Sequence, residues 1–462
     1  MNFRHYFIGE NSMKIIIVGL GTIGKTILHT LSKDHTITII DEDKDKVESL
    51  IERYDVFGVV GNGACIDILN EANVKDSDLA IFLTNSDELN VFACLVAKRG
   101  GVKNTIARVR NPDYTKQIRD MKDELGISMI VNPEKETAKE IFNLINFPSV
   151  AQMEHFVKGK AILVEIVAER GCKILGETLF SLGRKIKTRV LVCAVQRGDE
   201  VYIPSGAFRF EEGDRVYFTA DATSLKDFLS EINLEKSPFK HIMIIGDGKI
   251  PFYLAEELCE NKYDIKLVAN NKRTAEMLAE ELPKATILCG NGTQHDLLIE
   301  EGIEAMDAFV ALTDIDEENM IVSMFANKMG VKKTITQIKS DELYDMLGEL
   351  GIENNVSPKN VVADRIIGYV RAMANKRGSN IVTVYRLVQG QVEALEFAAK
   401  RKEKYFDTPL KELKTKENCL IACISREGEV IIPDGNTTIQ LGDSVIVVTT
   451  HKNFDDLNDV FE

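Results

Sequence analysis

The sequence predicts an α/β protein with two doubly wound parallel-sheet domains, each followed by a small α+β domain, in a tandem duplication. Three observations support this fold class. Short, almost entirely apolar runs alternate with segments of helical periodicity, which is typical of buried parallel strands joined by crossover helices. A glycine-rich loop follows the first apolar run of each half. Features of the first half recur in the second half at a nearly constant offset.

The first half supplies the strands of one predicted sheet. Its apolar runs are KIIIV (14–18), TITII (36–40), FGVV (57–60), LAIFL (79–83), TIARV (105–109) and SMIV (128–131). Apolar residues between these runs follow helical spacing, for example Ile23, Ile27 and Leu31 after the first run. We therefore expect an open, doubly wound parallel sheet.

The pattern changes from about residue 155 to 232. Strand-like segments such as ILVEIV and VYIP occur with hairpin signals at Arg197-Gly198-Asp199 and Glu212-Gly213-Asp214, and this stretch has no glycine-rich loop. A small α+β domain fits this pattern, and Ser237-Pro238 marks the seam before the cycle begins again. The predicted parts are an N-terminal extension (1–12), parallel-sheet domains at 13–147 and 237–374, and small domains at 148–236 and 375–462.

The duplication is visible in matched segments. Gly61-Asn62-Gly63 recurs as Gly290-Asn291-Gly292, an offset of 229 residues. The same offset relates Asp67 to Asp296, Thr84 to Thr313, and Pro204 to Pro433. The first glycines of the two loops, Gly19 and Gly246, differ by 227, so we expect about two residues to have been gained between the first helix and the second strand.

Composition excludes several classes of protein. Among 462 residues, 57 Lys and Arg face 72 Asp and Glu, and the resulting net charge of −15 argues against nucleic acid as the main partner. No apolar run approaches the roughly 18 residues of a membrane span, so we expect a cytoplasmic protein. The eight cysteines form no CxxC pair, and neither a disulfide framework nor a metal site is predicted.

The first glycine-rich loop has the pattern of a Rossmann-like dinucleotide site. In Gly19-Leu20-Gly21-Thr22-Ile23-Gly24, the first glycine makes the tight turn, the second lets a pyrophosphate approach the backbone, and the third allows close packing of helix and strand. The helix that follows offers free N–H groups to phosphate. Asp41 ends the second strand 22 residues after Gly19, where its carboxylate can accept both ribose hydroxyls and repel a 2′-phosphate. This favours NAD over NADP.

The same letters also match a Walker A pattern, Gly19 through Gly24-Lys25-Thr26, which would indicate an ATPase or GTPase. The dinucleotide interpretation is favoured because it alone explains Gly21 and Asp41. The second copy, Gly246-Asp247-Gly248-Lys249-Ile250-Pro251, also keeps only the first two glycines of the dinucleotide pattern.

The second copy has lost features that a dinucleotide needs. The constant offset of 229 places Asn270 at the position of Asp41, and Pro251 replaces the third glycine. The favoured hypothesis is that this copy is a scaffold. The alternative is that Lys272 and Arg273 bind a phosphorylated ligand.

Groups for hydride-transfer catalysis are not evident. No Tyr-xxx-Lys pair occurs, and the seven histidines have no spacing that indicates a relay or a metal site. We therefore predict ligand sensing and no enzymatic activity. Two alternatives stay open at this point: an NAD-dependent oxidoreductase that uses the small domains to hold substrate, and an assembly protein whose cleft is vestigial.

Together these features resemble the tandem RCK (KTN) family, the cytosolic NAD-binding regulatory subunits of Trk-type potassium uptake systems. The resemblance covers residues 13–462 and rests on the four-part domain order, together with the Gly-Asn-Gly…Asp and Leu-Thr-x-x-Asp-Glu-x-Asn segments of each copy. It implies a homo-oligomeric gating ring, peripherally associated with the inner face of the membrane. The implied partner is a transmembrane potassium-translocating subunit of the TrkH/TrkG type.

The resemblance also implies roles for individual residues. NAD(H) is the implied cofactor, and several relatives bind ATP and ADP in the same cleft. Gly19, Leu20, Gly21, Thr22, Ile23 and Gly24 would hold the pyrophosphate, Asp41 the adenosine ribose, and Asn62 and Gly63 would lie near the adenine. Thr84, Asn85 and Arg108 would line the far side of the cleft.

Overall fold

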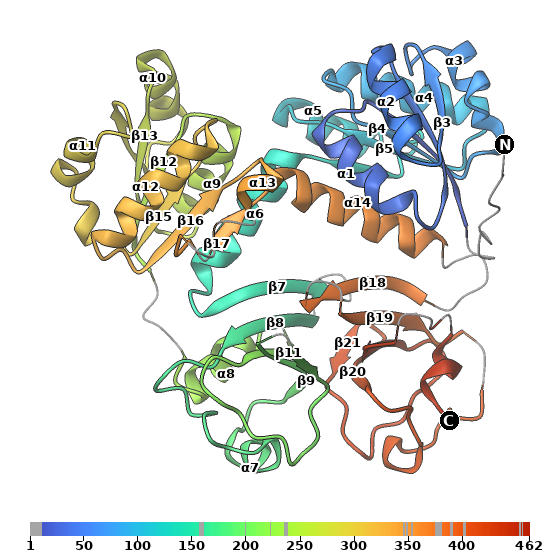
Figure 1. Cartoon of the computed structure of the whole chain (residues 1–462), viewed down its shortest axis with the longest axis vertical. Coiled ribbons are helices and arrows are strands. Elements are labelled where there is room, and N and C mark those ends of the chain that lie inside the picture. The colour runs from blue at the N-terminus through green and yellow to red at the C-terminus, as the bar shows by residue number, and fades with distance from the viewer. Residues whose placement is uncertain are drawn as a thin grey trace. The chain divides into compact units, whose positions relative to one another are not determined.

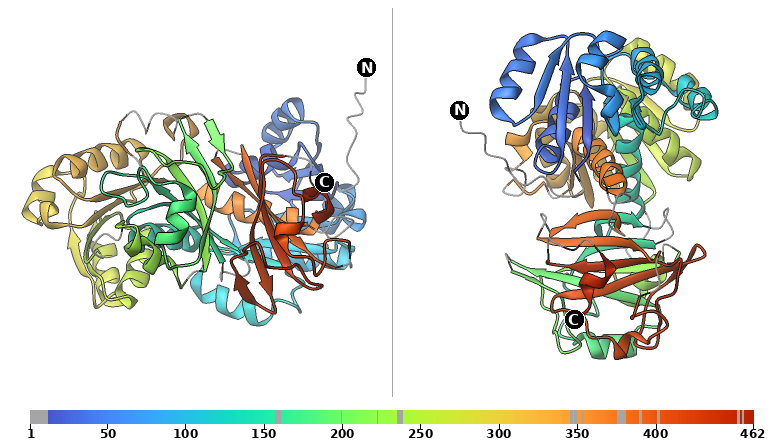
Figure 2. Two further views of the ribbon diagram at one scale, coloured as in Figure 1. Left: turned by 90° about the horizontal axis from the view of Figure 1, so that it is seen from below. Right: turned by 90° about the vertical axis from the view of Figure 1, so that its right-hand side faces the viewer.

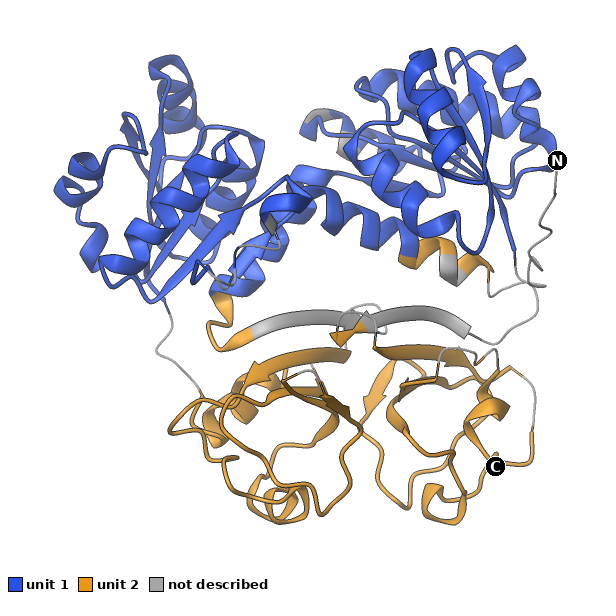
Figure 3. Cartoon of the chain, in the orientation of Figure 1, with its two compact units in different colours: residues 1–145, 239–367 blue, residues 146–238, 368–462 orange. Residues whose placement is uncertain are grey.

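The computed structural model divides the chain into two compact units (Figure 3), residues 1–145 with 239–367 and residues 146–238 with 368–462. The first unit holds both parallel sheets, and the second holds both antiparallel sheets. The structure describes residues 12–156, 161–198, 200–221, 223–234, 239–344, 347, 350–352, 354–374, 381–388, 391–400, 403–451, 454 and 456–462. The predicted extension, apart from Ser12, and the seam at Ser237-Pro238 lie outside these residues.

The first parallel sheet has the strand order β3-β2-β1-β4-β5-β6. Its elements are β1 (Lys14–Val18), α1 (Thr22–Leu31), β2 (Thr36–Asp41), α2 (Lys44–Arg53), β3 (Phe57–Val60), α3 (Ile66–Glu71), β4 (Leu79–Phe82), α4 (Asp87–Gly100), β5 (Asn104–Arg108), α5 (Pro112–Asp120), β6 (Met129–Val131) and α6 (Pro133–Asn146). All neighbouring strands are parallel, and the chain reverses its direction of winding beside β1. The six predicted strands and the doubly wound topology are confirmed. Figures 1 and 2 show this sheet with the helices that accompany it.

The second parallel sheet repeats the first in the order β14-β13-β12-β15-β16-β17. Its elements are β12 (His241–Ile245), α9 (Lys249–Glu260), β13 (Asp264–Ala269), α10 (Lys272–Glu281), β14 (Thr286–Cys289), α11 (His295–Glu300), β15 (Ala308–Ala311), α12 (Asp316–Lys328), β16 (Lys333–Gln337), α13 (Asp341–Tyr344), β17 (Asn354–Val356) and α14 (Pro358–Ala374). The duplication is therefore confirmed at the level of strand order.

Strand register corrects the predicted match for Asp41. Asp41 pairs with Val60 at the end of β2, and the residue in the same place on β13 is Ala269, which pairs with Cys289. The prediction that Asn270 occupies this position is wrong. The offset is 227 up to the first helix, 228 across the second strand and helix, and 229 from the third strand to the helix after the fifth strand. One residue was gained between the first helix and the second strand, and one between the second helix and the third strand. Because Ala269 stands at the end of β13, the second copy has no carboxylate there.

Helix α6 follows the first sheet in sequence but packs into the core of the second domain. Ala138, Ile141, Leu144 and Ile145 are buried in one apolar cluster with residues of the second sheet and its helices, among them Leu254, Leu267 and Val310. Burial of an Ile or Leu side chain contributes about 1.5–3 kcal/mol. Helix α6 thus fastens the edge of the first sheet to the second domain.

Asp307, just before β15, is held by a lysine and two backbone N–H groups. Lys332 Nζ lies 2.7 Å from its carboxylate, and the N–H groups of Lys240 and His241 donate to it at 2.8 and 3.1 Å. Desolvation raises the pKa of Asp307, but these hydrogen bonds outweigh it and lower the pKa to about 2. The unfolded value is about 3.9, so the ionised form contributes about 2 kcal/mol to stability.

We expect Asp307→Asn to lower the free energy of unfolding by about 2 kcal/mol at pH 7, where this contribution is complete. The difference from wild type should shrink as the pH falls from about 4 toward 2, because the carboxylate of the wild type becomes protonated there. The urea unfolding transition of the domain that contains Asp307, followed at pH 7, 4 and 3, measures this. Asp314→Asn, which removes a fully exposed partner of Lys339, is the control and should leave stability nearly unchanged at every pH.

The second unit contains two five-stranded antiparallel sheets. The first has β7 (Val150–Phe156), β8 (Ala161–Val167), α7 (Leu179–Lys185), β9 (Val190–Arg197), β10 (Glu200–Tyr202), β11 (Arg215–Asp221) and α8 (Leu225–Glu231). The second has β18 (Ile381–Leu387), β19 (Val392–Ala398), β20 (Cys419–Arg426), β21 (Glu429–Ile431) and β22 (Ser444–Thr449). The hairpin predicted at Arg197 is confirmed between β9 and β10. Gly213 instead lies in a turn that leads into β11.

The two small modules share an apolar core. Ala161, Leu163, Cys193 and Tyr217 of the first module lie in one buried cluster with Val392, Ala394, Cys423 and Ile446 of the second. Thr219 Oγ1 donates to the Ala422 carbonyl at 2.8 Å across this junction. The modules therefore pair with each other within the unit. The predicted domain boundaries at 147, 236 and 374 stay a prediction.

None of the helices in the described ranges has both the length and the apolar character needed to cross a bilayer.

Candidate functional site

The glycine loop joins β1 to α1 at the carboxyl edge of the first sheet, where the winding direction changes. This is the position at which open α/β sheets bind ligands. Gly19 has φ +92°, and a Cβ there would lie 2.8 Å from the Leu83 carbonyl carbon. A Cβ on Gly24 would lie 2.2 Å from the Gly19 oxygen, so both positions require glycine for packing.

Gly21 differs because the protein itself does not require a glycine there. Its φ is −72°, and a Cβ would meet no atom within 4 Å. Gly21 precedes α1 as the N-cap without a side-chain hydrogen bond, and the first turn carries no acidic residue. The N–H groups at the start of this ten-residue helix therefore have neither a side-chain cap nor an acidic residue in the first turn, as an anion site requires.

Asp41 lies beside this loop at the end of β2. Its carboxylate accepts the Leu20 N–H at 2.7 Å and the Asp43 N–H at 3.0 Å. The two backbone donors fix the carboxylate next to the helix start while the side chain stays half-buried. Thr22 is exposed and Ile23 partly buried in the first turn of α1, so the structure brings the predicted pyrophosphate and ribose residues together.

Asn62 and Gly63 follow β3 near the same edge. Asn62 is exposed, and its Oδ1 accepts the Ala64 N–H at 2.9 Å. A Cβ on Gly63 would lie 2.3 Å from Val18 Cγ1, so this glycine allows the loop to pack on β1.

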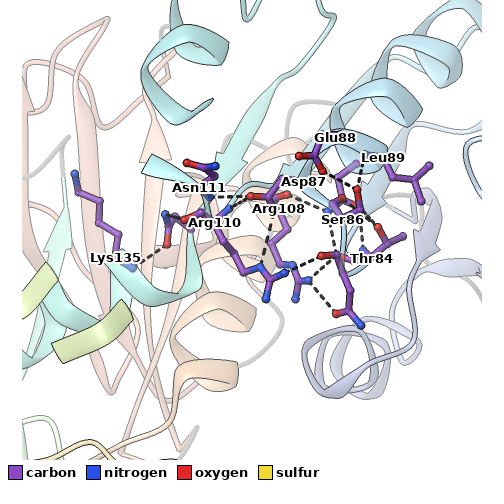
Figure 4. A network of polar contacts seen from close by, with 12 residues as sticks. Thr84, Ser86, Asp87, Glu88, Leu89, Arg108, Arg110, Asn111 and Lys135 are labelled. Atoms are coloured by element: carbon purple, nitrogen blue, oxygen red, sulfur yellow. Dashed lines mark hydrogen bonds and ion pairs between the residues drawn. The ribbon is translucent and has the colours of Figure 1, made fainter. Parts of the chain in front are cut away.

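Thr84 and Arg108 lie in one polar network (Figure 4), and Asn90 of α4 bonds both of them. Asn90 Oδ1 accepts the Thr84 N–H at 2.9 Å and its hydroxyl at 2.7 Å. Asn90 Nδ2 donates to the carbonyl groups of Thr84 and Arg108 at 3.1 and 3.0 Å. This buried amide fastens the ends of β4 and β5 together.

Arg108 is a buried cation at this edge. Its side chain is only 9% exposed, and Nη2 donates to the Thr84 carbonyl at 2.6 Å and to Asn85 Oδ1 at 3.2 Å. Burial lowers the pKa of Arg108, and the nearby positive charge of Arg110 lowers it further. An anion placed here would stabilise the guanidinium.

The sequence analysis missed three charged residues near this edge, which are Asp87, Arg110 and Glu134. Asp87 Oδ2 accepts the N–H groups of Arg110 and Asn111 at 2.8 Å each, and Arg110 Nη2 donates to the Asn85 carbonyl at 2.7 Å. Buried polar atoms without a hydrogen-bond partner occur on Arg108 Nε and Glu134 Oε2, and also on Arg110 Nε and Asp87 Oδ1, which form an ion pair with each other at 3.8 Å. Such atoms are rare in proteins unless a ligand or water meets them. The available sequence signal was the Arg-Val-Arg run at the end of the fifth strand.

The second copy keeps the uncharged framework of this edge and changes its charges. Asn319 bonds Thr313 and the Gln337 carbonyl as Asn90 bonds Thr84 and Arg108. Gln337 stands in the place of Arg108 and donates to the Thr313 carbonyl at 3.2 Å. With neutral Gln337 and with Ala269 at the strand end, this edge has lost both charged groups proposed for a nucleotide.

Other details bear on the alternatives. Thr26, the last Walker A position, donates its hydroxyl to the Thr22 carbonyl of its own helix at 3.0 Å. Lys272 pairs with Glu276 at 4.0 Å on the surface of α10, and its counterpart Lys44 pairs with Glu48 at 3.4 Å on α2. The position of Lys272 is thus not particular to the second copy. Within the described ranges, no group of His, Cys, Asp and Glu side chains is arranged to hold a metal ion.

Two family models match this chain in tandem. The TrkA-N domain matches residues 15–133 and 242–358, and the TrkA-C domain matches residues 163–233 and 395–462. These spans correspond to the two parallel sheets and to most of the two antiparallel modules.

Proteins similar over nearly the whole chain carry one name. The Trk system potassium uptake protein TrkA of Vibrio alginolyticus is 32% identical over 452 residues, which cover 96% of this chain and 97% of that protein. The TrkA homolog 1 of Methanosarcina mazei is 31% identical over 443 residues, covering 94% and 97%. These names describe potassium uptake proteins, in agreement with the prediction that the chain is not an enzyme.

Among solved structures, the GsuK channel bound to NAD has a TM-score of 0.65 at 17% identity, covering 95% of this chain and 77% of that one. The GsuK RCK domain has a TM-score of 0.63 at 17% identity, covering 95% and 92%. At this identity the likeness concerns the fold alone. The matched domains and the full-length relatives place the chain in the TrkA family of Trk potassium uptake proteins, with TrkA-N and TrkA-C domains in tandem.

Proposed function

We propose that the chain is a cytoplasmic regulatory subunit of a Trk-type potassium uptake system that binds NAD(H) in its first Rossmann-like domain. The observation that carries the proposal is the open space at Gly21, framed by the start of α1 and by the oriented carboxylate of Asp41. Backbone N–H groups suit a pyrophosphate, and the carboxylate suits a ribose diol. ATP or ADP would use the same contacts, and the structures named as GsuK bound to NAD and GsuK bound to ADP show that a protein of similar fold binds ligands of both kinds.

The far side of the cleft would receive the remainder of the ligand. Arg108 supplies a buried positive charge, and Thr84 and Asn85 hold it in place through the contacts described above. We expect a distal phosphate or the second half of a dinucleotide to meet this group. Asn62 and Gly63 would lie on the adenine side.

The regulatory step would act on a transmembrane partner of the TrkH/TrkG type. A nucleotide shifts a conformational equilibrium only if it binds one state more tightly, and its effect on the partner would follow from that difference. The chain would then act as a peripheral component at the inner face of the membrane.

Self-association into a gating ring is part of the same proposal. Phe92 on α4 is 55% exposed, and Ile321 at the matching place on α12 is 58% exposed. Ile66 of α3 and Met324 of α12 add exposed apolar surface to these helices. Exposed apolar groups of this size favour burial against another molecule. Light scattering of the purified chain tests this, and a monomer at all concentrations would contradict it.

Calorimetric titration followed by flux measurement tests the central proposal. The full chain is titrated with NADH, NAD, ATP and ADP, and the same nucleotides are then added to vesicles that hold the chain and its potassium-translocating partner. We expect one site per chain and a nucleotide-dependent potassium flux. Lack of binding by all four nucleotides would contradict the site, and binding without any change in flux would contradict regulation. Turnover of NADH with a candidate substrate would favour the oxidoreductase alternative.

A further inference from the structure

The ligand edge of the first domain receives one residue from the second domain. Tyr253 belongs to α9, the helix that follows the second glycine loop, and its side chain is only 6% exposed. Its hydroxyl donates to the carbonyl oxygen of Arg110 at 3.4 Å. Tyr253 belongs to the same apolar cluster as Ile141 and Leu144 of α6, so its ring is fixed in the core that joins the two domains.

Arg110 is held at each of its polar backbone groups. Its N–H donates to Asp87 at 2.8 Å, and its carbonyl accepts Asn132 Nδ2 at 3.4 Å in addition to the Tyr253 hydroxyl. Its side chain donates to the Asn85 carbonyl at 2.7 Å, while Nε is buried without a hydrogen-bond partner. Arg110 is therefore poised between the ligand edge and the second domain.

Asn132 and Lys135 extend this link to the start of α6. Asn132 Oδ1 accepts the Lys135 N–H at 2.9 Å and so caps the helix. Lys135 Nζ lies 6.0 Å from the centre of the Tyr253 ring. The tyrosine thus contacts both the residue that faces the ligand edge and the first turn of the helix that enters the second domain.

We propose that Tyr253 is a positioning residue of the first nucleotide site and that it couples occupancy of this site to α9 of the second domain. The inference rests on the proposed nucleotide site. The bond to Arg110 is longer than the usual O–H···O distance of about 2.7–2.8 Å, so a displacement of a few tenths of an ångström strengthens or breaks it. Arg110 Nε makes no hydrogen bond and lies 3.8 Å from Asp87 Oδ1, so an anionic group of the ligand that binds this guanidinium supplies such a displacement.

The duplication provides an internal comparison. The counterpart of Tyr253 on α1 is Thr26, whose hydroxyl bonds its own helix, and the counterpart of Arg110 is Lys339. In the part of the chain that the structure describes, no hydrogen bond runs from α1 to Lys339. Among the described residues, the hydrogen bond from the neighbouring domain is therefore found at the edge that carries Arg108 and Arg110. This is the edge proposed to bind the nucleotide.

The affinity test uses ligands of different reach on the full-length chain. AMP, ATP and NADH are titrated into wild type, Tyr253→Phe and Tyr263→Phe. Tyr263 packs against the same core and on the Phe142 ring at 6.3 Å, so its variant removes a hydroxyl from the same cluster. We expect Tyr253→Phe to weaken ATP and NADH about two- to tenfold. AMP binding should stay within about twofold, because AMP ends near the glycine loop.

Hydrogen exchange tests the coupling separately. Saturating NADH should slow amide exchange in residues 249–260 of wild type and Tyr263→Phe, and this effect should be lost in Tyr253→Phe. Equal weakening of AMP, ATP and NADH, or unchanged protection of α9 in Tyr253→Phe, would overturn the inference while leaving the nucleotide site intact. A wild type that binds none of the three ligands would instead contradict the proposed function, and the inference would fall with it.

Discussion

Gly21→Ala is expected to lower the affinity of the chain for NADH at least about 30-fold, or about 2 kcal/mol, while its stability stays nearly unchanged. The physical reason is that a Cβ at this position meets no protein atom within 4 Å and projects into the space proposed for the pyrophosphate. The φ of −72° is one that alanine adopts without strain. Calorimetric titration gives the affinity, and urea unfolding gives the free energy of unfolding.

The duplicated loop supplies a matched control. Gly248 also precedes a helix, with φ −87°, and the nearest atom to its Cβ would be Pro251 Cδ at 4.0 Å. Gly248→Ala makes the same chemical change on the copy interpreted as a scaffold, so NADH affinity should equal that of wild type. An equal loss of affinity in both variants, or full affinity in Gly21→Ala, would exclude the proposed pyrophosphate position.

Asp41 is a weaker probe of the same site because it has two roles. Its carboxylate orients the glycine loop through the Leu20 N–H as well as facing the proposed ribose. A change in affinity in an Asp41 variant therefore combines loss of ribose binding with movement of the loop. Gly21 separates these effects, since its side of the loop touches nothing in the protein.

The sequence predicted the parallel sheets well because buried parallel strands leave a strong local signal. Runs such as KIIIV and LAIFL are apolar on both faces, and this pattern is hard to mistake when helical segments separate the runs. The glycine loop was equally readable, since the three glycines lie within six residues directly after an apolar strand, and Gly24 packs on the Gly19 oxygen inside the same loop.

What the sequence could not predict depends on contacts between distant segments. The packing of α6 into the second domain and the contact of Tyr253 with Arg110, 143 residues away, have no local signature. The prediction that Asn270 is the counterpart of Asp41 was also wrong, because a one-residue insertion in a loop leaves no mark on the apolar pattern. Strand register was needed to place Ala269 there.

Loss of a buried ion pair in the second unit is expected to lower stability more than any other substitution considered. Asp214 is fully buried and accepts Arg197 Nε at 2.7 Å, Arg197 Nη2 at 2.8 Å and the Glu211 N–H at 2.8 Å. The hydrogen bond to Asp214 is the main cause that raises the pKa of Arg197. Arg426 and Asp443 repeat this pair in the second module at 2.9 Å, so the duplication has kept it.

Asp214→Ala should destabilise the first small module by about 3 kcal/mol. Removing one partner of a buried pair costs about 3–5 kcal/mol, and the lower figure applies because the Arg197 side chain is about one-third exposed and retains some hydration. Since a chain with several domains need not unfold in one step, the measurement is urea-dependent hydrogen exchange of peptides from β8, β9 and β11. These strands should exchange at lower urea concentrations than in wild type.

Glu211→Gln provides the control on the same arginine. Glu211 lies 2.7 Å from Arg197 Nη1, but its side chain is 60% exposed, so solvent screens the pair and its loss should cost about 0.5 kcal/mol or less. Burial and not distance then decides the outcome, because the two acids lie equally close to the guanidinium. If Glu211→Gln destabilised these strands as much as Asp214→Ala, the buried pair would not be the main electrostatic contribution to this module.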